Sequence, residues 1–284
     1  MSIIGCGTMG SAILQGVLSA SSRSEAAEEE PKIAHFIATV QSSSSAEKLR
    51  TRFSSCLSRL EVIEKDNVGA MQRADIILLA CKPYMAQTVL AAPGVREALE
   101  GKLVISVLVG SPVEKLEGFI FHPGRTLGEH IYIKRAMLNI AAEFGESMTV
   151  IETSPMPAEF EEISNWIFSQ VGEIAPVAPD LFDIGGVLAG PSSAFLSVAL
   201  DGMLDGAVKE GLKRADAKKI LTQSLLSLAK LLEMGEHPAV LRERYSSPRG
   251  TTIEGLQSLE EDRVRYAFSK AVIASSKRSQ EIGK

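Results

Sequence analysis

SIIGCGTMGSAILQGVLS, residues 2–19, decides the fold of this chain. A short apolar segment leads into Gly5, Gly7 and Gly10, which fit the spacing G-x-G-x-x-G. In that spacing the first glycine permits a tight turn, the second lets a pyrophosphate approach the backbone, and the third lets a helix pack closely on a strand. Apolar side chains then recur at helical spacing, at Ile13, Leu14, Val17 and Leu18. Strand, glycine turn and helix together predict a dinucleotide site, with phosphate oxygens accepting from N–H groups at the helix start.

Segments typical of strands and helices alternate from this turn to residue 177. Apolar runs without alternation, as in strands buried on both faces, occupy residues 75–80 and 103–108, with a helix expected between them from about Tyr84 to Leu99. Further strands are expected at 33–40, near Val62, at 148–152 and at 173–177. This alternation implies right-handed crossovers and a mostly parallel sheet. We therefore expect an α/β protein with a Rossmann domain over residues 1–177, and the short lead-in suggests that the sequence begins part-way through the first strand.

The pattern changes after Pro179, and residues 178–284 are predicted to form an all-helical domain. Apolar residues recur there at helical spacing, and small residues that permit close helix packing stand at Ala199, Gly202 and Gly206. The helices are more apolar than a domain of this size needs for its own core. We therefore expect a homodimer that buries them between subunits, with assembly into a higher oligomer as an alternative.

Composition excludes several classes of partner. The net charge of −5 and the sequence pI of about 5.6 give no basic surface, so nucleic acid is not an expected partner. The chain lacks an uninterrupted apolar run of membrane-spanning length and a signal-peptide pattern, so we expect a cytoplasmic protein. No metal site or catalytic triad is predicted, because the cysteines and histidines are scattered, at Cys6, Cys56, Cys81, His35, His122, His130 and His237.

The end of the second strand bears on the choice of nicotinamide cofactor, because an acidic residue there binds the ribose 2′-hydroxyl and repels a 2′-phosphate. Val40 is followed by Gln41 and four serines, and the first carboxylate is Glu47. Ser42 and Ser43 are candidate contacts of the cofactor, with cations nearby at Lys48 and Arg50. This composition favours NADPH, with NADH as the alternative.

Several stretches together resemble the pyrroline-5-carboxylate reductase family. They are GCGTMGSAI (5–13), ACKPYM (80–85), RAMLNIAAEFGESMTV (135–150), GAVKEGL (206–212), GEHPAVLRERYSSPRGTTIEGLQSLE (235–260) and KRSQEIG (277–283). The resemblance covers nearly the whole chain. It implies an N-terminal Rossmann domain, a helical domain that forms an intertwined dimer, and NAD(P)H-dependent reduction of the cyclic imine 1-pyrroline-5-carboxylate to L-proline, the last step of proline biosynthesis.

The resemblance also assigns site residues. It implies that the cofactor is held by Gly5, Gly7, Thr8, Met9 and Gly10 in the first loop, by Cys81, Lys82 and Pro83 beside the nicotinamide, and by Asn139. It implies that the substrate carboxylate is held by the loop SSPRGTT, residues 246–252, through Ser247, Gly250, Thr251 and Thr252. Backbone N–H groups at a helix start and short hydroxyl side chains suit that role. No catalytic acid is assigned.

Some positions depart from the family pattern and leave the substrate open. Arg249 stands where the family has glycine, and it is a candidate bidentate partner for a carboxylate. Other departures are Leu138, Ile140, Ala141, Gly186 and Pro191. They keep two alternatives open: a reductase of a substituted pyrroline or piperideine carboxylate, and a non-catalytic dinucleotide-binding relative. A 3-hydroxyacid dehydrogenase is disfavoured, because residues 191–206 contain no lysine.

Overall fold

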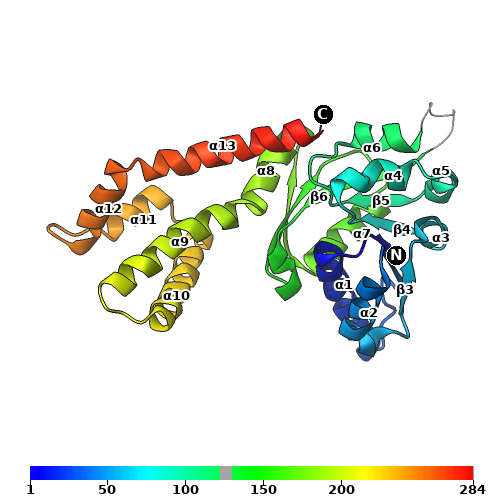
Figure 1. Cartoon of the computed structure of the whole chain (residues 1–284), viewed down its shortest axis with the longest axis horizontal. Coiled ribbons are helices and arrows are strands. Elements are labelled where there is room, and N and C mark those ends of the chain that lie inside the picture. The colour runs from blue at the N-terminus through cyan, green and yellow to red at the C-terminus, as the bar shows by residue number, and fades with distance from the viewer. Residues whose placement is uncertain (122–129, 284) are drawn as a thin grey trace. The chain divides into compact units, whose positions relative to one another are not determined.

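The computed structural model describes residues 1–121 and 130–283 (Figure 1). The chain divides into two compact units. Residues 1–191 form the first unit together with the C-terminal segment from residue 275, and residues 192–274 form the second unit.

An eight-stranded sheet organises the described part of the first unit. Its order is β3-β2-β1-β4-β5-β6-β7-β8. The strands are β1 (Ser2–Ile4), β2 (Phe36–Val40), β3 (Leu60–Glu64), β4 (Ile76–Leu79), β5 (Leu103–Ser106), β6 (Tyr132–Met137), β7 (Ser147–Glu152) and β8 (Gly172–Val177). Every pairing among them is parallel except that of β6 with β7. The predicted α/β class and mostly parallel sheet are confirmed, and the order turns back at β1, between β2 and β4, as at a dinucleotide-binding edge.

Helices cover both faces of this sheet and create two cores. One core joins the sheet to α1 (Thr8–Ala26), α2 (Ser43–Arg52) and α7 (Ala158–Ser169). The other joins it to α3 (Asn67–Gln72), α4 (Ala86–Leu90), α5 (Val95–Leu99) and α6 (Val113–Ile120). Short 3₁₀ turns are η1 (Ser54–Cys56), η2 (Pro83–Met85), η3 (Ile140–Phe144) and η4 (Pro179–Leu181), and α8 (Phe182–Ala189) packs on β7.

Two local predictions were wrong. The continuous helix expected over residues 84–99 is divided into η2, α4 and α5, since Pro93 lacks a donor and Gly94 adopts φ +84°. Strand β6 was not predicted, because Lys134 and Arg135 lie in its centre.

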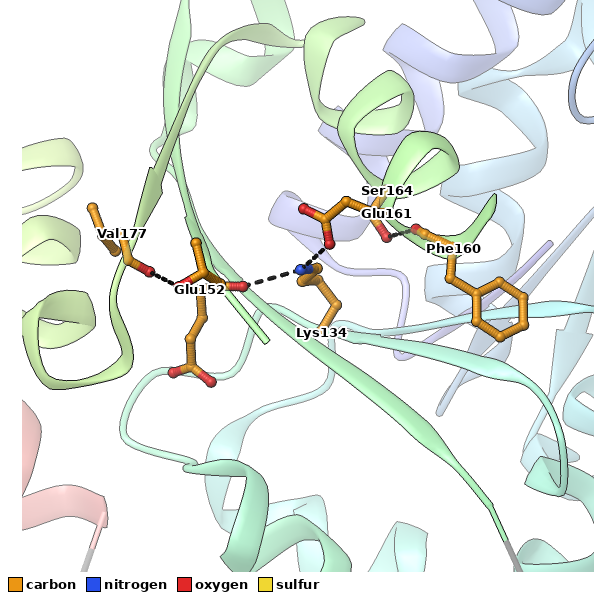
Figure 2. Close-up of polar contacts among 7 residues, drawn as sticks. Lys134, Glu152, Phe160, Glu161, Ser164 and Val177 are labelled. Carbon is orange, nitrogen blue, oxygen red and sulfur yellow. Dashed lines mark hydrogen bonds and ion pairs between the residues drawn. The ribbon is translucent and has the colours of Figure 1, made fainter. Parts of the chain in front are cut away.

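Buried partners make those two charges compatible with the sheet. Lys134 is fully buried and donates to the Glu152 carbonyl oxygen at 3.1 Å and to Glu161 Oε2 at 2.5 Å (Figure 2). Arg135 Nη1 pairs with Glu152 Oε2 at 2.6 Å, and its guanidinium lies 4.1 Å from the centre of the Phe182 ring. Burial raises the pKa of Glu152 above its ordinary value, while Arg135 opposes that rise. These contacts tie β6 to β7, α7 and α8.

The second unit consists of helices. They are α9 (Ser192–Lys209), α10 (Arg214–Glu233), α11 (Pro238–Arg244), α12 (Thr251–Glu261) and most of α13 (Val264–Gly283), whose last turns belong to the first unit. Within residues 192–274, all of them described, only Ala217 and Leu241 are buried apolar residues. More than half of the surface of large apolar side chains is exposed at Leu196, Val198, Met203, Ile220, Leu226, Met234, Tyr245, Tyr266 and Ile273. A single copy of this unit therefore has almost no core of its own.

Residues 179–209 also meet a length and composition criterion for a membrane-crossing helix, since an 18-residue window within them has a mean hydropathy of 1.4. This criterion averages hydropathy over a window, whereas the sequence itself contains no uninterrupted apolar run of that length, because polar residues interrupt the segment. Gly190 and Pro191 form a turn within it. One such segment is weak support for a membrane span, because core helices of soluble proteins meet the same criterion.

The predicted domain boundary at residue 178 coincides with the last described strand, which ends at Val177. Packing groups the chain differently, since α8 and the end of α13 belong to the first unit. For example, Ser279 Oγ donates to Asp183 Oδ1 at 2.7 Å. The assignment of separate roles to residues 1–177 and 178–284 stays a prediction.

Candidate functional site

The glycine turn has the geometry that its spacing predicts. Gly5 adopts φ +79°, and a Cβ atom there would lie 2.7 Å from Cys81 Cα, so no side chain fits. Gly7 precedes α1 and is exposed, and the nearest atom to a Cβ added there is 4.0 Å away. At Gly10 an added Cβ would lie 3.0 Å from Ile3, so this glycine lets α1 pack on β1. The first glycine thus forms the turn, the second leaves open space, and the third permits close packing.

A partly buried hydrogen-bond chain holds the turn in place. Gly5 N donates to Thr39 Oγ1 at 3.1 Å, and that hydroxyl donates to Asn67 Oδ1 at 2.7 Å. Cys6 N donates to the Thr39 carbonyl oxygen at 2.8 Å. Thr39 belongs to β2 and Asn67 begins α3, so two neighbouring elements fix the loop. No local sequence pattern revealed either residue, because Thr39 reaches the turn from strand β2 and Asn67 reaches it from the start of helix α3.

A cavity of about 460 Å³ lies at the carboxyl ends of the strands around this turn. One part of its wall is formed by Val40, Gln41, Ser45 and Asn67, and another part by Val107, Val109, Met137, Leu138 and Ile140. Its position matches the edge at which open α/β sheets bind nucleotides. Its wall is mostly apolar with a few polar groups, as in small-molecule sites generally.

The predicted cofactor residues fall into two groups. The structure brings seven of them together on the cavity wall: Gly5, Gly7, Thr8, Met9, Cys81, Lys82 and Pro83. The other four, Gly10, Ser42, Ser43 and Asn139, are not among the residues of the wall. Ser42 caps α2 by accepting from Ser45 N at 3.3 Å, and Ser43 Oγ donates to Glu64 Oε2 at 2.7 Å. Direct contact of these four residues with a cofactor stays a prediction.

Asn139 has a structural role that the sequence did not indicate. Its Oδ1 accepts from Ala141 N at 2.9 Å and caps η3, while its Nδ2 donates to the Ala189 carbonyl oxygen at 2.7 Å. The side chain therefore fixes two wall residues, Leu138 and Ile140, against the end of α8.

We expect Asn139→Ala to lower the free energy of unfolding by about 2 kcal/mol, because the cap and the bond to Ala189 are both lost. Asn139→Ser retains a capping hydroxyl but is too short to reach Ala189, so about half of that loss should return. Denaturant titration measures both values. Equal stability of the two variants would show that the cap contributes nothing. Cofactor binding is a separate question: if Asn139 contacts the cofactor directly, both variants should also weaken NADPH binding by the same factor.

Two cysteines of the cavity wall are protected thiols. Burial raises the pKa of Cys6 and of Cys81 from 9.0 to about 11. Since the thiolate is the reactive form, both should be poor nucleophiles at neutral pH.

We therefore expect iodoacetamide at pH 7.5 to alkylate Cys56 first, and Cys6 and Cys81 at least about tenfold more slowly, although Cys56 and Cys81 are both partly exposed. Peptide mass spectrometry over time follows the three sites. Labelling of Cys81 as fast as of Cys56 would contradict a protected thiol at the cavity.

The predicted substrate loop lies in the second unit and forms one tight turn. Gly250 N donates to the Ser247 carbonyl oxygen at 2.9 Å, with Pro248 and Arg249 at the corner. Arg249 is exposed and adopts φ +60°, a conformation that glycine favours at this position of a turn. A Cβ at Gly250 would lie 2.4 Å from Ser247 Oγ, and Thr251 and Thr252 begin α12. The turn thus gathers all five predicted residues at one helix start.

No metal centre is visible in the described part of the chain, which holds no group of three or more His, Cys, Asp or Glu residues able to bind an ion. His122 lies outside the described residues. The prediction of no metal site therefore stays a prediction.

Comparisons with known proteins find the same family of reductases by family model, by sequence and by structure. Residues 179–282 match the family model of pyrroline-5-carboxylate reductase dimerisation, and residues 1–110 match that of NADP oxidoreductase, coenzyme F420-dependent. A pyrroline-5-carboxylate reductase of Lophium arboricola is 38% identical, covering 100% of this chain and 93% of the relative. One of Neurospora crassa is 40% identical, covering 96% and 89%. The solved structure of Plasmodium falciparum pyrroline carboxylate reductase with NADP bound covers 100% of this chain and 97% of its own at 24% identity, with a TM-score of 0.83.

Proposed function

The chain belongs to the pyrroline-5-carboxylate reductase family, and we propose that it reduces 1-pyrroline-5-carboxylate to L-proline with NADPH, the last step of proline biosynthesis. The observation that carries this proposal is the cavity at the strand ends, where seven residues expected to hold the cofactor form one wall around the Gly5 turn. Full-length similarity to proteins named pyrroline-5-carboxylate reductase supports the assignment of this substrate.

The residues present fit a dinucleotide. Gly7 leaves open space where a pyrophosphate must approach, and the first N–H groups of the 19-residue helix α1 have no partners within the helix. When bound, a reduced nicotinamide supplies the hydride for the imine carbon. The protein's part is to position the imine and to exclude water. The exposed Lys82 and the buried wall residues Met137 and Leu138 are suited to those tasks.

The loop at residues 246–252 is proposed to hold the substrate carboxylate. Gly250 begins α12, so N–H groups at that helix start and the hydroxyls of Thr251 and Thr252 are donors for an anion. Arg249 adds a cation to the same turn. Its φ angle of +60° is one that residues other than glycine adopt rarely, which supports a role for the side chain.

We also propose that the protein is a cytoplasmic homodimer. The second unit buries only two of its apolar residues in a single copy, and apolar surface of that extent is typical of a subunit interface. The match to a dimerisation model over residues 179–282 supports the same assembly. The exposure of the apolar segment at residues 179–209 is then explained without a membrane.

A direct spectrophotometric assay of NADPH oxidation tests the activity. Purified protein of measured molar mass is mixed with NADPH and 1-pyrroline-5-carboxylate, and absorbance at 340 nm is followed with proline quantified as product. We expect turnover by a dimeric species. Turnover only on substituted pyrroline or piperideine carboxylates would favour the specialised reductase suggested by Arg249, and cofactor binding without turnover on any cyclic imine would favour a non-catalytic relative.

A further inference from the structure

We propose that Glu64 sets the balance between NADPH and NADH by placing a carboxylate beside the cofactor's 2′ position. The inference rests on the proposed function, because it assigns a selectivity determinant within the same cofactor site. The sequence contains no acidic residue at the end of the second strand, yet the fold brings one there from the third strand.

Strand register puts Glu64 at this edge. Val40 and Glu64 are paired in the register of β2 and β3 and are the last residues of both strands. Lys65 N donates to the Val40 carbonyl oxygen at 3.0 Å, so the pairing continues to the strand ends. The residue after Val40 is Gln41, which belongs to the cavity wall. Glu64 therefore stands beside the point where the chain leaves β2 to form that wall.

A hydrogen bond ties the carboxylate to the start of α2. Ser43 Oγ donates to Glu64 Oε2 at 2.7 Å, and Ser43 is the first residue of this helix. Two residues further along the chain, Ser45 lies on the cavity wall. A helix start is favourable for negative charge, and Glu64 already supplies a negative charge there.

The two cofactors differ at this position by a phosphate. A ribose 2′-hydroxyl can donate a hydrogen bond to a carboxylate, as it does to the acidic residue at the end of the second strand in NAD-binding folds. A 2′-phosphate cannot donate in its ionised form, and it meets Glu64 as a like charge. It must also compete with Glu64 for the Ser43 hydroxyl.

Two of the nearby cations have other partners in the structure, and Glu64 itself is exposed. Arg50 Nη2 donates to the Val62 carbonyl oxygen at 2.9 Å, and Arg52 pairs with Glu143 at 2.9 Å. Lys48 and Lys65 are exposed and supply the remaining positive charge close by in sequence. The serines and lysines alone would favour NADPH strongly. Glu64 thus lowers this preference, so that NADH also binds.

Glu64→Gln tests the proposal, since the amide keeps the length of the side chain and an acceptor for Ser43 but removes the charge. Dissociation constants for NADPH and NADH are measured by nucleotide fluorescence on the intact protein. We expect affinity for NADPH to rise about tenfold, equal to about 1.4 kcal/mol, with NADH changed less than about twofold. Glu64→Lys should move the ratio further in the same direction.

Glu61→Gln is the matched control, because Glu61 lies on the same strand and pairs with Arg73 at 2.9 Å. It should leave the ratio of the two dissociation constants unchanged. An unchanged ratio in both Glu64 variants, with thermal unfolding as in the wild type, would overturn the assignment of Glu64 alone. A wild-type protein that binds neither nucleotide would overturn the proposed function and this inference with it.

Discussion

Arg135→Ala is expected to lower the free energy of unfolding of the first unit by about 3–5 kcal/mol. The side chains of Arg135 and Glu152 are 8% and 6% exposed, and their atoms meet at 2.6 Å. Removal of the guanidinium leaves a buried carboxylate whose pKa burial already raises. It also removes the cation that lies over the Phe182 ring, which joins β6 to α8. Trp166, the single tryptophan, lies in α7 of the same unit and reports its unfolding by fluorescence in denaturant.

Two further variants test whether the effect of Arg135→Ala arises because the ion pair is buried. Arg73→Ala breaks a pair whose side chains are about half exposed, and should cost less than about 1 kcal/mol. Arg135→Met combined with Glu152→Leu removes both charges and should recover most of the lost stability, because apolar replacements of similar volume satisfy a buried ion-pair site. An Arg135→Ala protein no less stable than Arg73→Ala would show that the buried pair is dispensable.

The same pair explains why part of the sheet could not be predicted. The segment YIKRAM contains two adjacent charges, and no local rule separates a buried strand with partners from an exposed turn. Glu161 follows Lys134 by 27 residues and Glu152 follows Arg135 by 17, so their partnership exists only once the sheet has formed. The glycine turn, by contrast, was predictable because its backbone requirement is local: Gly5 adopts φ +79°, a conformation that glycine favours.

The residues of the candidate site likewise fall into those that the sequence predicted and those that it did not. Gly5 and Gly7 were predicted from the glycine motif, whereas Thr8, Met9 and residues 81–83 were predicted from the family resemblance, and all of them lie on the cavity wall. Thr39 and Asn67 were missed, because Thr39 reaches the Gly5 turn from β2 and Asn67 reaches it from the start of α3. Glu64, whose role is proposed above, lies beside Val40 only through the register of β2 and β3. Asn139 was predicted from a motif, but its side chain is engaged by Ala141 and Ala189. Motifs thus locate a site, while long-range pairing decides which side chains are free to act in it.

Gly7→Ala is expected to weaken NADPH binding by about 100-fold, equal to about 2.7 kcal/mol, while the protein folds as before. Gly7 lies on the cavity wall, and a Cβ added there meets no described atom closer than 4.0 Å. The substitution therefore strains nothing in the free protein. The added methyl group instead occupies the space through which a pyrophosphate must approach the backbone. Isothermal titration with NADPH gives the affinity, and thermal unfolding confirms that the fold is retained.

The neighbouring glycine separates loss of binding from loss of folding. Gly5→Ala forces a side chain to within 2.7 Å of the Cys81 backbone at φ +79°, so it should destabilise the first unit itself. Gly118→Ala, in the middle of α6, has no described atom within 4 Å of the new Cβ and should leave both affinity and stability close to the wild type. If Gly7→Ala binds NADPH as tightly as the wild type, the pyrophosphate does not cross this loop, and the cofactor cavity has been assigned to the wrong edge of the sheet. If it loses affinity and stability together, Gly7 supports the fold as Gly5 does, because only loss of affinity at constant stability identifies the residue that a dinucleotide must approach.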